Sequence, residues 1–182
     1  MVDLNTRKIL ITGGPGTGKS TLINALIARG FLCMEEISRQ VIIEAQKKGI
    51  DQLFLTDPMQ FSNMLLKGRA QQFYDAQKIK DQTVFFDRGV HDVLAYMDFI
   101  GDAYPTEFTE TCKNARYDMV FILKPWKAIY ISDSERYETF EQAQDIYKYL
   151  VKTYEAYQYQ LIDVPFDTVE NRTNFILKTC KL

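Results

Sequence analysis

A short segment near the N-terminus places glycines, a lysine and a serine at a spacing that suits phosphate chemistry. It matches G-x-x-x-x-G-K-[ST] in full and ends in Lys19 and Ser20. The glycines permit tight backbone turns that point amide groups at phosphate oxygens. Lys19 supplies a cation for the β- and γ-phosphates, and the Ser20 hydroxyl suits Mg²⁺. The pattern therefore predicts a nucleoside triphosphate site with Mg²⁺, formed by Gly13, Gly14, Pro15, Gly16, Thr17, Gly18, Lys19 and Ser20.

A second group follows the apolar run at residues 83–86, where Asp87 precedes Arg88. Open parallel sheets bind ligands at the carboxyl ends of their strands. A carboxylate there can reach Mg²⁺ directly or through water. We therefore predict Asp87 as a metal-binding and catalytic residue. The alternative is a structural ion pair between Asp87 and Arg88.

Two further carboxylates, Glu35 and Glu36, follow the apolar run at residues 31–34 and are expected at the same edge. A carboxylate beside the γ-phosphate can accept a proton from an attacking hydroxyl. We predict that Glu36 has this catalytic role, with Asp87 as the other candidate. Alternatively, one glutamate caps the helix expected from Ile37, because negative charge favours a helix N-terminus.

Arg136 lies among acidic residues after the apolar run at 119–123. A mobile arginine can neutralise the charge that develops on a transferred phosphoryl group, so Arg136 is a catalytic candidate. The alternative is an arginine on a solvated helix face. The single histidine, His91, has no neighbours at a ligand spacing and is predicted to have no catalytic role.

These side chains can meet only if the strands before them end at the same edge of one sheet. The pattern of apolar residues predicts such strands. Short apolar runs predict strands at residues 8–12, 31–34, 83–86, 119–123 and 161–162. Longer amphipathic stretches predict helices at 19–29, 37–48, 90–100, 140–159 and 169–180, and Asp57-Pro58 predicts a helix start that leads towards Lys80. Continuous apolar strands separated by helices predict an α/β fold with a doubly wound parallel sheet.

Composition limits the classes to which the chain can belong. Its 182 residues include 22 Lys and Arg against 24 Asp and Glu, a net charge of −2, and 46% are hydrophobic. This balance excludes an intrinsically disordered chain and argues against a general nucleic-acid binder, which needs a strongly basic surface. The length and the absence of linkers predict one domain over residues 1–182.

The cysteines and apolar runs indicate where the protein resides. Cys33, Cys112 and Cys180 form no C-x-x-C pair, which favours reduced thiols over a zinc or redox site. No apolar run approaches the roughly 18 residues of a membrane span. The N-terminus lacks the cleavage site of a secretory signal. We therefore expect a cytoplasmic protein.

Several motifs together resemble the NadR-like P-loop ATPase and kinase family, which includes the ribosylnicotinamide kinase part of NadR and the animal TRP translocation-defect protein. The resemblance covers nearly the whole chain. It rests on GGPGTGKSTL from Gly13, GF-x-C-x-EEISRQVI from Gly30, DP-x-QFS from Asp57, FFDRG-x-x-DVLAYM from Phe85, W-x-x-x-Y-x-x-D-x-x-R from Trp126, and V-E-x-R from Val169.

The resemblance implies a nucleotide-kinase-like, five-stranded parallel sheet in the order 2-3-1-4-5, with a helical lid around residues 126–145. It implies that Thr21 joins the triphosphate site and that Pro165 lies close to the base. Glu36, Arg39, Arg88 and Trp126 would bind the acceptor, and Arg136 would act from the lid. The family pattern differs here at His91 and Lys124, near the acceptor site.

We hypothesise from these patterns a Mg²⁺-dependent kinase that transfers phosphate from ATP to a small, hydroxyl-bearing and nucleoside-like metabolite. GTP is the other donor, although the chain lacks the guanine-reading N-K-x-D motif. The alternative is a nucleotide-gated switch that uses ATP or GTP to control binding of a protein or lipid headgroup. A closed pocket at Glu35, Glu36 and Arg39 would favour the kinase, and a flat surface would favour the switch.

Overall fold

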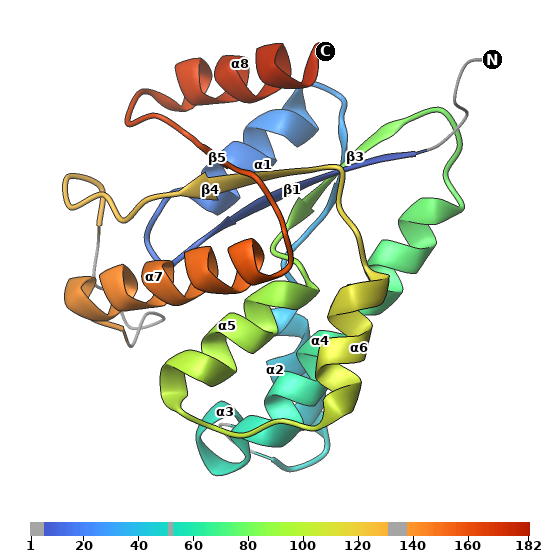
Figure 1. The fold of residues 1–182 in the computed structure, drawn as a ribbon, viewed down its shortest axis with the longest axis vertical. Helices are drawn as coiled ribbons and strands as arrows, with labels where there is room; N and C mark the ends of the chain where they lie inside the picture. Colours follow the sequence, from blue (N-terminus) through green and yellow to red (C-terminus); the bar gives the residue numbers. More distant parts are fainter. Residues whose placement is uncertain (1–5, 51–52, 131–137) are drawn as a thin grey trace.

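The computed structural model describes residues 6–50, 53–130 and 138–182, and these form alternating strands and helices (Figure 1). The strands are β1 (Arg7–Gly13), β2 (Leu32–Met34), β3 (Thr83–Asp87), β4 (Met119–Leu123) and β5 (Leu161–Asp163). The helices are α1 (Lys19–Ala28), α2 (Ser38–Lys47), α3 (Leu53–Thr56), α4 (Pro58–Gln77), α5 (Val90–Ile100), α6 (Thr106–Asn114), α7 (Phe140–Ala156) and α8 (Val169–Cys180).

The strands form one parallel sheet in the order β2-β3-β1-β4-β5, so the predicted fold class and strand order are confirmed. The register pairs Ile11 of β1 with Asp87 of β3, and Phe86 of β3 with Met34 of β2. The segments that follow β1, β2 and β3 therefore leave the sheet at the same edge. This edge carries the phosphate loop, Asp87 and the two glutamates.

Side chains alternate between the two faces of the sheet, and each face packs against its own helices (Figure 1). Ile9, Phe85 and Phe121 pack with buried residues of α1 and α8. Leu10, Phe86 and Val120 pack with buried residues of α4, α5, α6 and α7. Because both faces are covered, the strands are continuously apolar, which is the pattern that predicts them.

Local capping explains where two of the long helices begin. The Asp57 carboxylate accepts a hydrogen bond from the Gln60 amide at 2.9 Å, directly before Pro58 at the first position of α4. At α7, the side chains of Thr139 and Gln142 accept hydrogen bonds from each other's backbone amides. The start predicted at Asp57-Pro58 is therefore confirmed.

Two short helices, α3 and α6, were not expected from the sequence. The helix α3 has only four residues, too few to show a helical period, and α6 is mostly polar and buries only Phe108 and Cys112. Arg136 and the central part of the lid predicted around 126–145 lie outside the described residues, while α7 begins at Phe140. In the described part of the chain, none of the helices has the length and apolar character to cross a membrane.

Candidate active site

The phosphate loop connects β1 to α1 and depends on left-handed glycines. Gly16 has φ 69° and Gly18 has φ 84°, a region that strongly favours glycine. Space is also limiting, because a Cβ atom on Gly16 would lie 2.5 Å from Cδ2 of Tyr130. Gly18 caps α1, so the positive end of that helix faces the loop. The loop therefore has the backbone that the sequence motif predicts.

Lys19 is almost fully buried inside this loop. Its Nζ donates hydrogen bonds to the Gly14 carbonyl at 2.6 Å and to Oγ1 of Thr17 at 3.3 Å. Burial and the neighbouring Arg88 lower the pKa of Lys19 to about 7, with Asp87 among the groups that oppose the shift. A phosphate bound in the loop would favour the charged form of Lys19. The ammonium group is thus held on loop oxygens at the place where a cation for phosphate is needed.

Asp87 ends β3 with 5% of its surface exposed, and its Oδ1 has no hydrogen-bond partner. Burial raises the pKa of Asp87, although Lys19 and Arg88 oppose the shift. No ion pair joins it to Arg88, which pairs instead with Glu36 and Asp92. A buried carboxylate oxygen without a partner fits a cation, and Ser20, the second residue of α1, is exposed directly after the loop.

Asp87 and Ser20 offer oxygen donors to a metal ion. Mg²⁺ is typically held by one or two protein oxygens together with phosphates and water, not by a cage of side chains. Within residues 6–50, 53–130 and 138–182, no cluster of three or more His, Cys, Asp or Glu could hold a metal ion. Asp87 and Ser20 therefore fit Mg²⁺ that arrives with a nucleotide.

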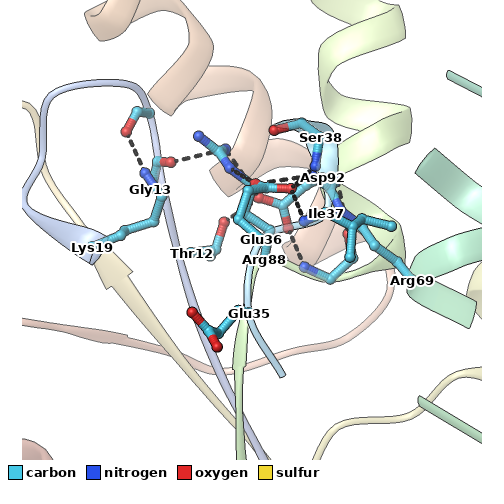
Figure 2. A network of polar contacts seen from close by, with 12 residues as sticks. Thr12, Gly13, Lys19, Glu35, Glu36, Ile37, Ser38, Arg69, Arg88 and Asp92 are labelled. Atoms are coloured by element: carbon cyan, nitrogen blue, oxygen red, sulfur yellow. Dashed lines mark hydrogen bonds and ion pairs between the residues drawn. The ribbon is translucent and has the colours of Figure 1, made fainter. Parts of the chain in front are cut away.

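Glu36 is the centre of a polar network at the ends of β2 and β3 (Figure 2). Its carboxylate lies 2.9 Å from Nη2 of Arg69 on α4 and 2.5 Å from Nε of Arg88. It also accepts hydrogen bonds from the amides of Ile37 and Ser38 at 3.0 and 3.1 Å, at the start of α2. Glu36 therefore accepts hydrogen bonds at the start of α2, as the capping alternative predicts, and its catalytic role stays a prediction.

These contacts set the charge of Glu36. Burial alone would raise its pKa, but Arg69, Arg88 and the hydrogen bonds lower the pKa of Glu36 to about 2. The side chain is therefore an ionised carboxylate at neutral pH. It is well suited to accept a hydrogen bond, and it is a weak proton acceptor.

Arg88 adopts a strained backbone conformation with φ 71°, which is unusual for a residue with a side chain. Its amide donates to the Ile11 carbonyl at 3.0 Å, and Nη1 donates to the Gly13 carbonyl at 3.3 Å. Figure 2 shows the guanidinium reaching towards both Glu36 and Gly13. Arg88 therefore connects the phosphate loop to the Glu36 network.

Asp92 supports this arrangement from the first turn of α5. Its carboxylate is 4% exposed and accepts hydrogen bonds from Thr12 Oγ1 at 2.6 Å, the Gly89 amide at 2.9 Å and the Tyr154 hydroxyl at 2.5 Å. Nη1 of Arg88 lies 3.7 Å away. Sequence reasoning did not assign a role to Asp92 or Arg69, because neither residue has a local pattern that reveals partners so distant in sequence.

The remaining predicted residues have no described contact with Glu36 or Arg88. Glu35, Arg39, Thr21 and Pro165 are exposed. Trp126 stacks on Phe166 with ring centroids 5.1 Å apart, and no described contact joins it to Glu36 or Arg88. Its acceptor role stays a prediction that these contacts do not support.

His91 lies outside the polar network although it follows closely in sequence. It is fully buried, and its ring centroid lies 4.7 to 6.1 Å from those of four tyrosines, Tyr117, Tyr154, Tyr157 and Tyr159. Burial lowers the pKa of His91 to about 4. The ring is therefore neutral at physiological pH and fills the core between the ends of α5, α6 and α7.

A cavity of about 380 Å³ is lined by residues of α7 and β5, and another of about 500 Å³ is lined by residues 116–120, 158–160 and Ile162. Tyr159 and Gln160 line both of them, and neither is lined by a residue of the phosphate loop or of the Glu36 network. They do not form the pocket that the kinase hypothesis expects beside Glu36.

Solved structures with the same fold include several kinases. Deoxyadenosine kinase from M. mycoides, with dCMP and dCDP bound, aligns with TM-score 0.69 and 18% identity over 96% of this chain and 98% of its own. Thymidylate kinase from Candida albicans aligns with TM-score 0.69 and 15% identity over 99% and 94%. At such identities the likeness establishes the fold.

NadR in complex with NR aligns with TM-score 0.70 and 17% identity over 97% of this chain. The chain spans about half of NadR, 52% of that protein's length. A comparison with curated proteins gave no match. A comparison with protein families matches residues 8–172 to an AAA domain, AAA_28. The NadR-like P-loop resemblance is thus confirmed, and the extent of the family match shows that this chain belongs to the AAA_28 family of AAA domains.

Proposed function

We propose that this protein is a Mg²⁺-dependent kinase that transfers the γ-phosphoryl group of ATP to a hydroxyl group of a nucleoside-like metabolite. The observation that carries the proposal is the ion-paired Glu36, held by Arg69 and Arg88 beside the phosphate loop. The two cavities do not form a closed pocket here, so the proposal rests on this partly exposed carboxylate, which can accept a hydrogen bond from an acceptor hydroxyl beside the loop. The kinase structures with the same fold add support.

The donor side consists of the phosphate loop with Lys19, Ser20 and Asp87. Loop amides and Lys19 bind the β- and γ-phosphates, and Lys19 exchanges the Gly14 carbonyl for phosphate oxygens. Ser20 and Asp87 hold Mg²⁺, which neutralises charge on the phosphates when it is bound. GTP is an alternative donor. Arg136 is proposed to approach the transferred group from the lid.

The acceptor side centres on Glu36. Its ionised carboxylate orients the attacking hydroxyl by accepting its hydrogen bond, and a loose transition state needs little help from a strong base. Arg88 holds that carboxylate towards the loop, and the exposed Arg39, in the first turn of α2, is proposed to bind the acceptor. Of the two glutamates, Glu36 is therefore the one we assign to catalysis.

The balance of charge in this network favours an uncharged acceptor group. Arg69 and Arg88 already share the Glu36 carboxylate, and Arg88 also approaches Asp92. A phosphorylated acceptor would need cations that are free to bind it. Arg69 and Arg88 are therefore occupied, so within this network the pairs support a nucleoside over a nucleoside monophosphate, and Arg39 is, among the described residues, the one acceptor-side arginine outside these pairs.

The experiment is a measurement of ADP release from MgATP with a panel of nucleosides and nucleoside monophosphates. At least one nucleoside should stimulate ADP release well above basal hydrolysis. Glu36→Gln should lower the stimulated rate about a hundredfold with ATP affinity mostly unchanged. Glu35→Gln, the exposed neighbour, is the matched control and should retain the rate. Equal loss in both variants, or no stimulation by any compound, would contradict the proposal.

A further inference from the structure

A buried arginine from the last helix contacts the phosphate loop from outside the sequence motif. Arg172 lies in the first turns of α8 and is 3% exposed. Its Nη2 donates a hydrogen bond to the Thr17 carbonyl at 3.2 Å. A Cβ atom on Gly18 would lie 3.0 Å from Nη1 of Arg172. The guanidinium is therefore packed directly against the Thr17–Gly18 peptide.

Within the part of the chain that the structure describes, no carboxylate forms an ion pair with this arginine. Among the same residues, the Nε of Arg172 has no hydrogen-bond partner. Its other neighbour is the ring of Trp126, whose centroid lies 5.7 Å from Cζ. Burying a charge is costly, so the carbonyl of Thr17 and the ring of Trp126 are the described groups that stabilise this guanidinium.

The peptide geometry indicates what that use is. In a trans peptide the carbonyl of one residue and the N–H of the next point in opposite directions. When Arg172 fixes the Thr17 carbonyl towards α8, the Gly18 N–H is directed to the opposite side of the loop. Phosphate binding needs inward-facing amides at this place, and Gly18 is free to rotate because it lacks a side chain.

The helix that carries Arg172 is anchored along its length. Arg29, which ends α1, donates a hydrogen bond to the Asn174 side chain at 2.6 Å. Arg7 at the start of β1 donates to the Cys180 carbonyl at 2.8 Å. The guanidinium is thus supported by a rigid element, as a group that fixes a loop must be.

We propose that Arg172 is a positioning residue for the donor nucleotide, which holds the Thr17–Gly18 peptide so that its N–H faces the phosphates and adds a positive charge behind the loop. This inference rests on nucleotide binding in the proposed function and does not depend on the acceptor. It concerns the triphosphate part of the donor and not its base.

The test compares the affinities of ATP and inorganic tripolyphosphate, which has no base, by titration calorimetry. Arg172→Met should weaken both ligands by the same factor, about tenfold, as expected for loss of a charge-assisted hydrogen bond. Arg172→Lys keeps the charge and should recover part of the loss for both. Arg29→Met, which removes another contact between α1 and α8, is the matched control and should leave both affinities unchanged.

Three results would overturn the inference. Weaker binding of ATP alone would mean that Arg172 recognises the base. Unchanged affinities in Arg172→Met, or equal losses in Arg29→Met, would mean that its role is only to support the fold. If Arg172→Met does not fold, Arg172→Lys decides between these results. Failure of the wild-type protein to bind either ligand would instead contradict nucleotide binding, and lack of transfer with normal binding would contradict only the kinase proposal.

Discussion

Nε of Arg88 lies 2.5 Å from Oε2 of Glu36, so an ion pair joins the segments that follow β3 and β2. The same guanidinium donates to the Gly13 carbonyl of the phosphate loop at 3.3 Å. Arg88 holds this place with a left-handed backbone, which costs on the order of 1 kcal/mol for a residue with a side chain. A strained backbone conformation persists only where surrounding contacts hold it. At Arg88 the contacts to Glu36 and Gly13 do so, and both residues belong to the candidate site.

Because the backbone at Arg88 is strained, two substitutions there should lower the kinase rate alike and differ in protein stability. Arg88→Gly and Arg88→Ala both remove the ion pair, and the kinase rate should fall at least about tenfold in each. Glycine adopts the left-handed conformation without strain, so Arg88→Gly should be more stable than Arg88→Ala by about 1 kcal/mol. Urea unfolding measures that difference. Equal stability of the two variants would show that the backbone at residue 88 is not strained.

Replacing Asp87 should weaken Mg²⁺-dependent nucleotide binding without lowering the stability of the free protein. Asp87→Asn should reduce the enhancement of ATP affinity by Mg²⁺ about tenfold or more, while ATP affinity in EDTA stays nearly unchanged. Without nucleotide, the variant should be at least as stable as wild type at pH 7, because the raised pKa of Asp87 shows that the ionised form is disfavoured in the folded state. Calorimetric titration and thermal unfolding measure the two effects. A variant that keeps the full Mg²⁺ effect would exclude Asp87 as a ligand.

We expect the buried His91 to make the protein less stable in mild acid. Burial lowers the pKa of His91 from 6.5 to about 4, so the unfolded chain binds a proton in a range where the folded protein does not. The free energy of unfolding should therefore decrease as the pH falls from about 6.5 to 4, by up to about 3 kcal/mol from this residue. His91→Phe should remove this part of the pH dependence, which urea unfolding at pH 7 and pH 4.5 can measure. The same pH dependence in both proteins would contradict the assignment.

The sequence predicts the fold and the phosphate loop because their signals are local. Each strand is a short apolar run, and the loop motif lies within eight consecutive residues. The helices α3 and α6 were not predicted because α3 has only four residues and α6 is mostly polar, so neither shows a clear helical period. The helix that was predicted up to Lys80 ends at Gln77, within the usual uncertainty of helix ends.

The partners of the site residues could not be predicted because they are distant in sequence. Arg69 lies in the middle of α4, 33 residues after Glu36, and nothing around it distinguishes it from a surface arginine. Arg172 donates its hydrogen bond to Thr17, which lies 155 residues earlier in the sequence. Trp126 was assigned to the acceptor from a family motif, but its position is determined by the packing of Phe166 and Arg172 around its ring.

The proposed kinase reaction is tested most directly by detecting the phosphorylated product. The wild-type protein is incubated with MgATP and a mixture of nucleosides, and the products are identified by mass spectrometry. The account predicts that at least one nucleoside becomes phosphorylated in proportion to the ADP released, and that Lys19→Ala lowers this yield at least about a hundredfold. Hydrolysis of ATP with no phosphorylated nucleoside, or near-normal transfer by Lys19→Ala, would contradict it.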